Sequence, residues 1–137
     1  MSDSIRQLVI RLHDAFSKNE FEKVLELCTD DVTVQAYAFG LSFYGKDGFM
    51  GFMQGFKSAF PDMAIMHKNM LVDGNRVAVE FTGNGTHTGT LQTPAGVIAP
   101  TGKTLVVTAC EFMEWENGKL KRLHNYQDAG SLMLQIS

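Results

Sequence analysis

Apolar residues recur at helical spacing in three parts of the chain. Two stripes lie near the N-terminus, over residues 5–16 and 21–28, and a third covers residues 49–60. Each stripe repeats every three to four residues, the spacing that gives an amphipathic helix one buried face. We therefore predict three helices. Residues 32–39 lie between the second and the third and are β-branched and aromatic, which predicts a strand.

From residue 63 onward the chain is predicted to be mainly β. Segments 63–71, 76–88, 104–115 and 120–127 are predicted strands, and a short helix is predicted over residues 130–135. Asp73-Gly74 and Asn117-Gly118 favour tight hairpin turns. A loop rich in Gly, Pro and Thr joins the two middle strands. Helices followed by antiparallel strands predict one α+β domain over residues 1–137, with a hollow between the helices and a curved sheet.

The third predicted helix contains Gly48, Gly51 and Gly55. Each costs the helix about 1 kcal/mol relative to alanine. Glycines three to four residues apart lie on one side of a helix. Two explanations are open: another backbone segment packs closely on this side, or the glycines form the floor of a ligand site.

Composition and charge restrict the partners that we expect. The chain is 45% hydrophobic, with ten Phe and eight Met, which form deformable walls either of a core or of a cavity for a flat apolar ligand. The net charge is −3 without a Lys/Arg cluster, so we expect neither nucleic acid nor an anionic membrane as a partner. No segment is long and apolar enough to span a membrane.

The cysteines and histidines indicate no cofactor and no metal. Cys28 and Cys110 lie far apart without metal-ligand spacing, and we interpret them as small buried hydrophobes in a reducing compartment, a disulfide being the alternative. The four His are scattered, with no carboxylate at ligand spacing. The N-terminus lacks the features of a signal peptide, so we expect a cytoplasmic protein.

An acidic residue interrupts an otherwise apolar strand face. Strand alternation places Glu111 on the same face as Ala109, Met113 and Trp115. The acid is either turned into a pocket or exposed on an amphipathic edge. In a pocket, burial would raise the pKa of Glu111, by up to ~3–5 units at full burial. A protonated acid could then donate a hydrogen bond to a ligand carbonyl oxygen.

Further polar candidates lie at or near strand ends. Asn125 and Gln127 share the matching face of the last strand, where they either contact a ligand carbonyl or pair with Glu111 and a backbone group. Asp128 is either the N-cap of the last helix or an acid of the site. His87 lies where a loop could cover the mouth of a pocket, and its alternative role is structural.

With its elements in this order, the chain resembles the fold shared by nuclear transport factor 2, ketosteroid isomerase and the SnoaL-type polyketide cyclases. The matching segments are TDDVTV, GKDGFMGFM and ENGKLKRLHNYQDAGSLMLQ, while GTHTGTL and TPAGVIAPTGKTL favour the SnoaL-like branch. The resemblance implies a cone-shaped, half-open barrel with a pocket between helices and sheet. It also implies a homodimer formed through the outer face of the sheet.

The resemblance also assigns site positions. The ketosteroid isomerase pattern falls on Ala36 for the base, Leu12 for the tyrosine and Glu111 for the oxyanion acid. Because two of these three residues are lost, steroid isomerisation by that mechanism is not expected. The histidine position of the cyclases falls near Glu111 and their aspartate position near Asn125, with Asp128 as the alternative.

Together these observations predict a small, apolar, carbonyl-bearing ligand. If the protein is an enzyme, we expect cyclisation or isomerisation by proton transfer without a cofactor. Glu111 would be the general acid or oxyanion donor, with Asp128 or Asn125 as its partner. A non-catalytic binding or dimerisation module is the alternative, and epoxide hydrolysis would need a polar Asp/Arg/Asp cluster. Besides Leu12, Ala36 and His87, the predicted ligand-contacting residues are Phe16, Met53, Phe56, Met113 and Leu123.

Overall fold

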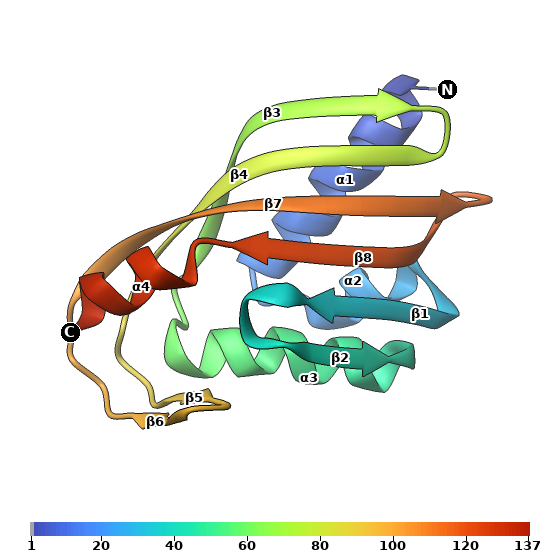
Figure 1. Cartoon of the computed structure of the whole chain (residues 1–137). Helices are drawn as coiled ribbons and strands as arrows, with labels where there is room; N and C mark the ends of the chain where they lie inside the picture. The colour runs from blue at the N-terminus through green and yellow to red at the C-terminus, as the bar shows by residue number, and fades with distance from the viewer. Residues whose placement is uncertain (1) are drawn as a thin grey trace.

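The computed structural model describes residues 2–137, with side chains from Ser4 onward (Figure 1). None of the described helices is long and apolar enough to cross a membrane. The elements in chain order are α1 (Ser2–Ser17), α2 (Phe21–Glu26), β1 (Cys28–Ala36), the 3-10 turn η1 (Tyr37–Phe39), β2 (Leu41–Tyr44), α3 (Gly45–Ala59), β3 (Ala64–Asp73), β4 (Arg76–Thr86), β5 (Leu91–Thr93), β6 (Gly96–Ile98), β7 (Thr104–Glu116), β8 (Lys119–Gln127) and α4 (Ala129–Ile136).

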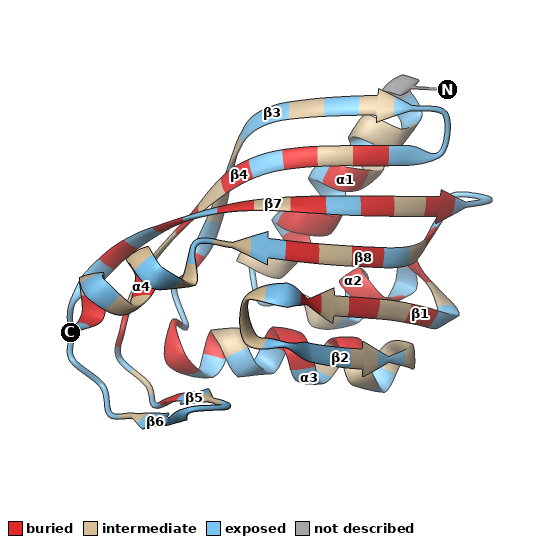
Figure 2. Cartoon of the chain, in the orientation of Figure 1, coloured by how far each residue is buried: buried red, intermediate tan, exposed pale blue. Residues whose placement is uncertain are grey.

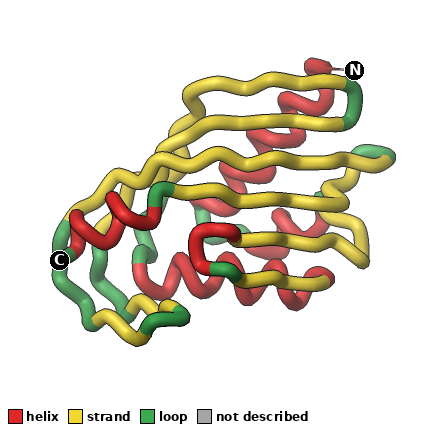
Figure 3. Tube along the Cα trace, viewed as in Figure 1, coloured by secondary structure: helices red, strands yellow, loops and turns green. Residues whose placement is uncertain are grey.

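Six strands form one mixed sheet in the order β2-β1-β8-β7-β4-β3. Only the β1–β8 pair of this sheet is parallel, and the other four neighbouring pairs are antiparallel. The long strands β4 and β7 bend strongly along their length (Figure 3). This arrangement confirms the predicted α+β fold with a curved, mainly antiparallel sheet.

The helices α1, α2 and α3 cover one face of the sheet (Figure 1). Along β4 and β7 buried residues alternate with more exposed ones, as Figure 2 shows, because successive side chains of a strand point to opposite faces. The main core lies between these helices and the inner sheet face. A second, smaller core lies where α4 packs on β7 and includes Phe60, Leu105 and Leu132.

The structure corrects the predicted element boundaries at three places. Strand β1 runs from Cys28 to Ala36 rather than over residues 32–39, and its register to β8 shifts between Cys28 and Thr33. The strand β2 was not predicted because LSFY is only 4 residues long and Phe43 is the one residue of the strand that is not exposed. The predicted surface loop contains a small hairpin of β5 and β6.

The two explanations for the glycines of α3 apply to different residues. A Cβ at Gly48 would lie 3.1 Å from the carbonyl carbon of Phe43, so a neighbouring backbone does approach closely there. At Gly51 and Gly55 a Cβ would meet no atom within 4 Å. These two glycines therefore border open space rather than a packed backbone.

Candidate active site

An apolar cavity of about 60 Å³ lies between the helices and the inner face of the sheet. Its volume accommodates a few water molecules as the side chains stand. Among the described residues that line it, Glu111 is the only carboxylate. The lining residues are Leu12, His13, Phe16, Val24, Phe49, Phe52, Met53, Phe56, Met63, Ile65, Phe81, Gly83, Val107, Ala109, Glu111, Leu123, Asn125 and Gln127.

Glu111 points inward from β7 and is only 5% exposed. Its Oε1 lies 2.7 Å from Nε2 of His13, and its Oε2 accepts a hydrogen bond of 2.8 Å from Nδ2 of Asn125. Both oxygens of this buried carboxyl group therefore lie within hydrogen-bonding distance of a side-chain nitrogen. The pairing of Asn125 with Glu111 is one of the two alternatives that the sequence left open.

The sheet register brings the amides to Glu111. Residues 111 and 125 are directly opposite each other in the antiparallel β7–β8 pair. Two residues further along β8, Nε2 of Gln127 donates a 3.0 Å hydrogen bond to Oδ1 of Asn125. The Oε1 atom of Gln127 is buried and accepts no hydrogen bond from the described residues. A buried acceptor without a donor lowers the stability of the folded state. Gln127 is one of the residues that line the cavity.

His13 completes the group from α1, and the sequence did not identify it as a site residue. The side chain is 4% exposed, and its ring centroid lies 4.8 Å from that of Phe81. The available signal was its position four residues after Val9 and three before Phe16, inside the apolar stripe of the helix. A histidine on such a buried face needs a polar partner, which here is Glu111.

The comparisons with known proteins agree with this fold. The family model for SnoaL-like polyketide cyclase matches residues 6–136. The chain belongs to the SnoaL-like polyketide cyclase family. No curated protein sequence matches it.

Solved structures with the same fold share little sequence with this SnoaL-like protein. A candidate SnoaL-like polyketide cyclase from Jannaschia sp. CCS1 has a TM-score of 0.86 at 18% identity, covering 98% of this chain and 92% of that one. IdmH from Streptomyces antibioticus, a candidate polyketide cyclase, has a TM-score of 0.80 at 21% identity, covering 96% of both chains. AclR from Streptomyces galilaeus, a candidate hydroxylase, has a TM-score of 0.83 at 18% identity, covering 96% of this chain and 94% of AclR.

Most of the predicted site residues of this SnoaL-like protein lie around the cavity. Glu111 and Asn125 line it and contact each other. Ala36 lines a neighbouring cavity instead. Met113 is fully buried in the main core and does not line the cavity. The predicted wall residues that do line it are Leu12, Phe16, Met53, Phe56 and Leu123.

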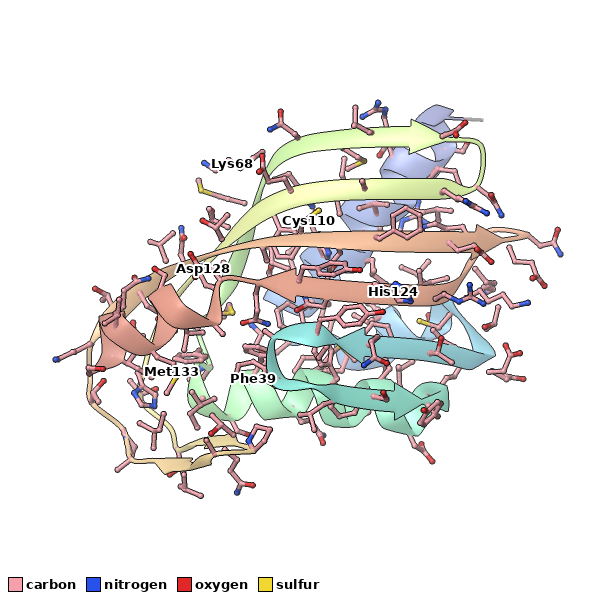
Figure 4. All side chains as sticks on the ribbon, in the orientation of Figure 1. Phe39, Lys68, Cys110, His124, Asp128 and Met133 are labelled. Atoms are coloured by element: carbon pink, nitrogen blue, oxygen red, sulfur yellow. The ribbon has the colours of Figure 1, made fainter. Side chains whose placement is uncertain are left out.

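Two further candidates, besides Ala36 and Met113, do not line the cavity. Asp128 is exposed where β8 meets α4 (Figure 4), and its Oδ1 accepts a 3.0 Å hydrogen bond from the backbone N–H of Ser131. This is the N-cap geometry, the alternative that the sequence left open. His87 is fully buried, with its ring 5.4 Å from Phe60 in the second core and its Nδ1 within 3.0 Å of the Thr101 hydroxyl. Neither residue lines the cavity.

A second cavity, of about 70 Å³, adjoins the first. The two share Phe52 and Phe56, whose rings form the partition between them. Gly51 and Gly55 line the second cavity, which explains the open space beside them.

No group of three or more His, Cys, Asp or Glu side chains that could hold a metal ion occurs in the described part of the chain.

Proposed function

We propose that this SnoaL-like protein is a cofactor-independent cyclase or isomerase that moves a proton next to a carbonyl group. The observation that carries the proposal is the buried Glu111, which His13 and Asn125 hold at the wall of an apolar cavity. A carboxylate in such a place is both fixed in direction and sheltered from water, as a general base requires.

The chemistry needs only these side chains. Glu111 takes a proton from the carbon next to the ligand carbonyl, and the electron pair of that C–H bond moves into an enolate. The enolate carbon then attacks a second carbonyl to close a ring, or is reprotonated at another carbon. Glu111 returns the proton to the new alkoxide or carbon, so no atoms are gained or lost. His13, donating to Glu111, stabilises the carboxylate before the proton is taken and after it has been returned.

The walls suggest the class of ligand. Phe52, Met53 and Phe56 are flexible or rotatable apolar side chains, and moving the phenylalanine partition would join the two cavities. The unpaired Oε1 of Gln127 would accept a hydrogen bond from a ligand hydroxyl or enol. We therefore propose a flat, mostly apolar ligand that carries at least one carbonyl and one hydroxyl group, as polyketide intermediates do.

Exchange of a C–H proton for deuterium tests the proposal without knowledge of the full reaction. Hydroxylated aromatic ketones would be incubated in D₂O with wild-type protein, and loss of the signal from the carbon next to the carbonyl followed by NMR. Glu111→Gln keeps the size of the side chain but removes the base, so we expect exchange to slow by about 10²-fold or more. Glu116→Gln, at the exposed end of the same strand, is the matched control. Equal exchange in Glu111→Gln and wild type would refute the proposal, and binding without exchange would favour a non-catalytic binding module.

An exposed aromatic patch supports a second proposal, that the protein forms a homodimer through the outer sheet face. The patch comprises Tyr37, Phe112, His124 and Tyr126, and both tyrosines are 47% exposed with ring centroids 4.8 Å apart. Sedimentation of wild type and Tyr126→Lys tests it: a dimer that becomes a monomer in the variant is expected, and a monomeric wild type would contradict it.

Epoxide hydrolysis is not proposed, because no arginine is among the described residues that line the cavity.

A further inference from the structure

The hydrogen-bonded group at the cavity continues beyond His13. Nδ1 of His13 lies 2.8 Å from Nε2 of His67, whereas its Nε2 faces Glu111. The two ring centroids are 5.0 Å apart and the ring planes differ by 17°. Because the ring planes are nearly parallel and two ring nitrogens are in contact, the imidazoles meet edge to edge. The N–H···N hydrogen bond then lies along the line between the rings. A continuous chain of titratable groups therefore runs from Glu111 through His13 to His67.

His67 stands at the outer end of this chain. It belongs to β3, an edge strand of the sheet, and it is partly exposed and does not line the cavity. The register between β3 and β4 shifts directly after His67, with Lys68 as the extra residue. Lys68 itself is exposed at the bend of β3 (Figure 4). Such a bulge changes the direction of neighbouring side chains. Here His67 faces His13 of α1, whereas Met70 and Val72 further along the strand are partly buried and pack against the core.

The contact between α1 and the edge strand is fixed on both sides of the histidines. Ser17 donates its hydroxyl to the backbone oxygen of His13 and accepts a hydrogen bond from the backbone N–H of Ile65. Near the other end of the helix, Arg6 donates to the backbone oxygen of Met70. The bonds to Ile65 and Met70 use backbone groups of the edge strand β3 and hold α1 against it, which keeps His13 and His67 at hydrogen-bonding distance.

We propose that His67 is a proton relay that connects the Glu111–His13 pair with solvent, an inference that rests on the acid/base function proposed above. In the outward step the Nδ1–H bond of a doubly protonated His13 breaks and an N–H bond forms at Nε2 of His67. Water then takes the proton from Nδ1 of His67. Both rings end neutral, and the reverse sequence carries a proton inward. A proton taken from a ligand can in this way leave the site instead of returning to the same molecule.

The surroundings of His67 suit this role. Burial lowers the pKa of His67, and the nearby His13 lowers it further, while Asp14 on α1 and Glu111 on β7 act in the opposite direction. Phe81 faces it from the neighbouring strand β4. A His67 that is neutral near pH 7 has a free ring nitrogen with which to receive a proton. A permanently charged ring could not take up another.

Solvent exchange of the His13 ring proton tests the relay without any ligand. Protein labelled with ¹⁵N-histidine would be compared by NMR, with the His13 signal assigned from its loss in His13→Gln. In His67→Gln the amide keeps a hydrogen-bonding group but cannot pass on a proton, so we expect exchange of the Nδ1 proton of His13, which faces residue 67, to slow by roughly tenfold or more. Lys68→Gln, which changes the exposed bulge residue next to His67, is expected to exchange like wild type.

Free imidazole separates a relay from a structural role. His67→Ala leaves a gap at a partly exposed position, and added imidazole is expected to restore fast exchange there and to have little effect on wild type. Exchange in His67→Gln at the wild-type rate, or a slow His67→Ala that imidazole does not accelerate, would overturn the relay. The exchange of the His13 ring proton is measured without a ligand, so its result does not depend on the proposed function. If Glu111→Gln exchanged the C–H proton of a ligand as fast as wild type, the proposed function would be refuted, but the result for His13 would still stand.

Discussion

Nε2 of His13 and Oε1 of Glu111, which are 98 residues apart in the chain, lie 2.7 Å from each other in the interior of the protein. The contact joins the first helix to the centre of the sheet. Burying either group alone would be unfavourable, because a buried charge or polar atom without a partner loses its hydration without compensation. The pair is therefore both a structural link and the chemical centre of the cavity.

Removing both partners is expected to cost less than the sum of the two single removals. His13→Leu leaves Glu111 with Asn125 as its only partner, and we expect it to lower the free energy of unfolding by about 3–5 kcal/mol. Glu111→Leu should cost less, about 1–3 kcal/mol, because a neutral His13 keeps its bond to His67. The double variant should be less destabilised than the sum of the two. Urea denaturation of the four proteins measures this coupling, and strictly additive effects would argue against it.

The inner face of the sheet was predictable because alternation along a strand is a local property. Glu111 on β7 and Asn125 on β8 point inward, as their positions in the sequence indicate. The partners on other elements were not predictable. His13 contacts Glu111 only when α1 has packed on the sheet. His67 faces α1 next to a one-residue bulge, and no sequence motif predicts this bulge. The sequence therefore did not identify His13 and His67, because their positions depend on the packing of α1 against the sheet and on the bulge in β3.

Asp128 is expected to contribute to stability rather than to chemistry. Its carboxylate caps α4 and lies outside the cavity. Asp128→Ala should therefore lower the free energy of unfolding by about 0.5–2 kcal/mol, and Asp128→Asn by much less, since asparagine caps a helix nearly as well. Thermal denaturation of the two variants measures the difference. Loss of ligand proton exchange in Asp128→Asn, with stability retained, would instead identify Asp128 as the acid of the site.

The glycines of α3 should respond differently to alanine. Gly55→Ala adds a methyl group that meets no atom within 4 Å, so the better helix propensity should raise the free energy of unfolding by up to about 1 kcal/mol. The same methyl group would narrow the second cavity and weaken binding of ligands that extend into it. Gly48→Ala is the matched comparison, because its methyl group would meet the backbone of Phe43 at 3.1 Å. Equal stabilisation by both substitutions would contradict this account.

The two cysteines are expected to differ in reactivity. Both are free, but Cys28 is buried, as predicted, whereas Cys110 is only partly buried, contrary to expectation. Burial raises the pKa of Cys28 to about 12, and burial raises that of Cys110 as well, with help from Glu111 and Glu80. A thiol reagent at mildly alkaline pH should label Cys110 first and Cys28 only on unfolding. Mass spectrometry of the native protein shows which is modified, and rapid labelling of Cys28 would contradict its burial.

The lowered pKa of His67 predicts a loss of stability in weak acid. The ordinary pKa of the side chain is 6.5, and burial and His13 lower it in the folded protein. Between the two values the unfolded chain binds more protons than the folded one, so the free energy of unfolding falls as the pH falls. His67→Gln removes this contribution, and its stability should therefore decline less steeply than that of wild type between about pH 7 and pH 5. Urea denaturation across this range gives both slopes. A His67→Gln slope as steep as that of wild type would mean that another group causes the loss of stability.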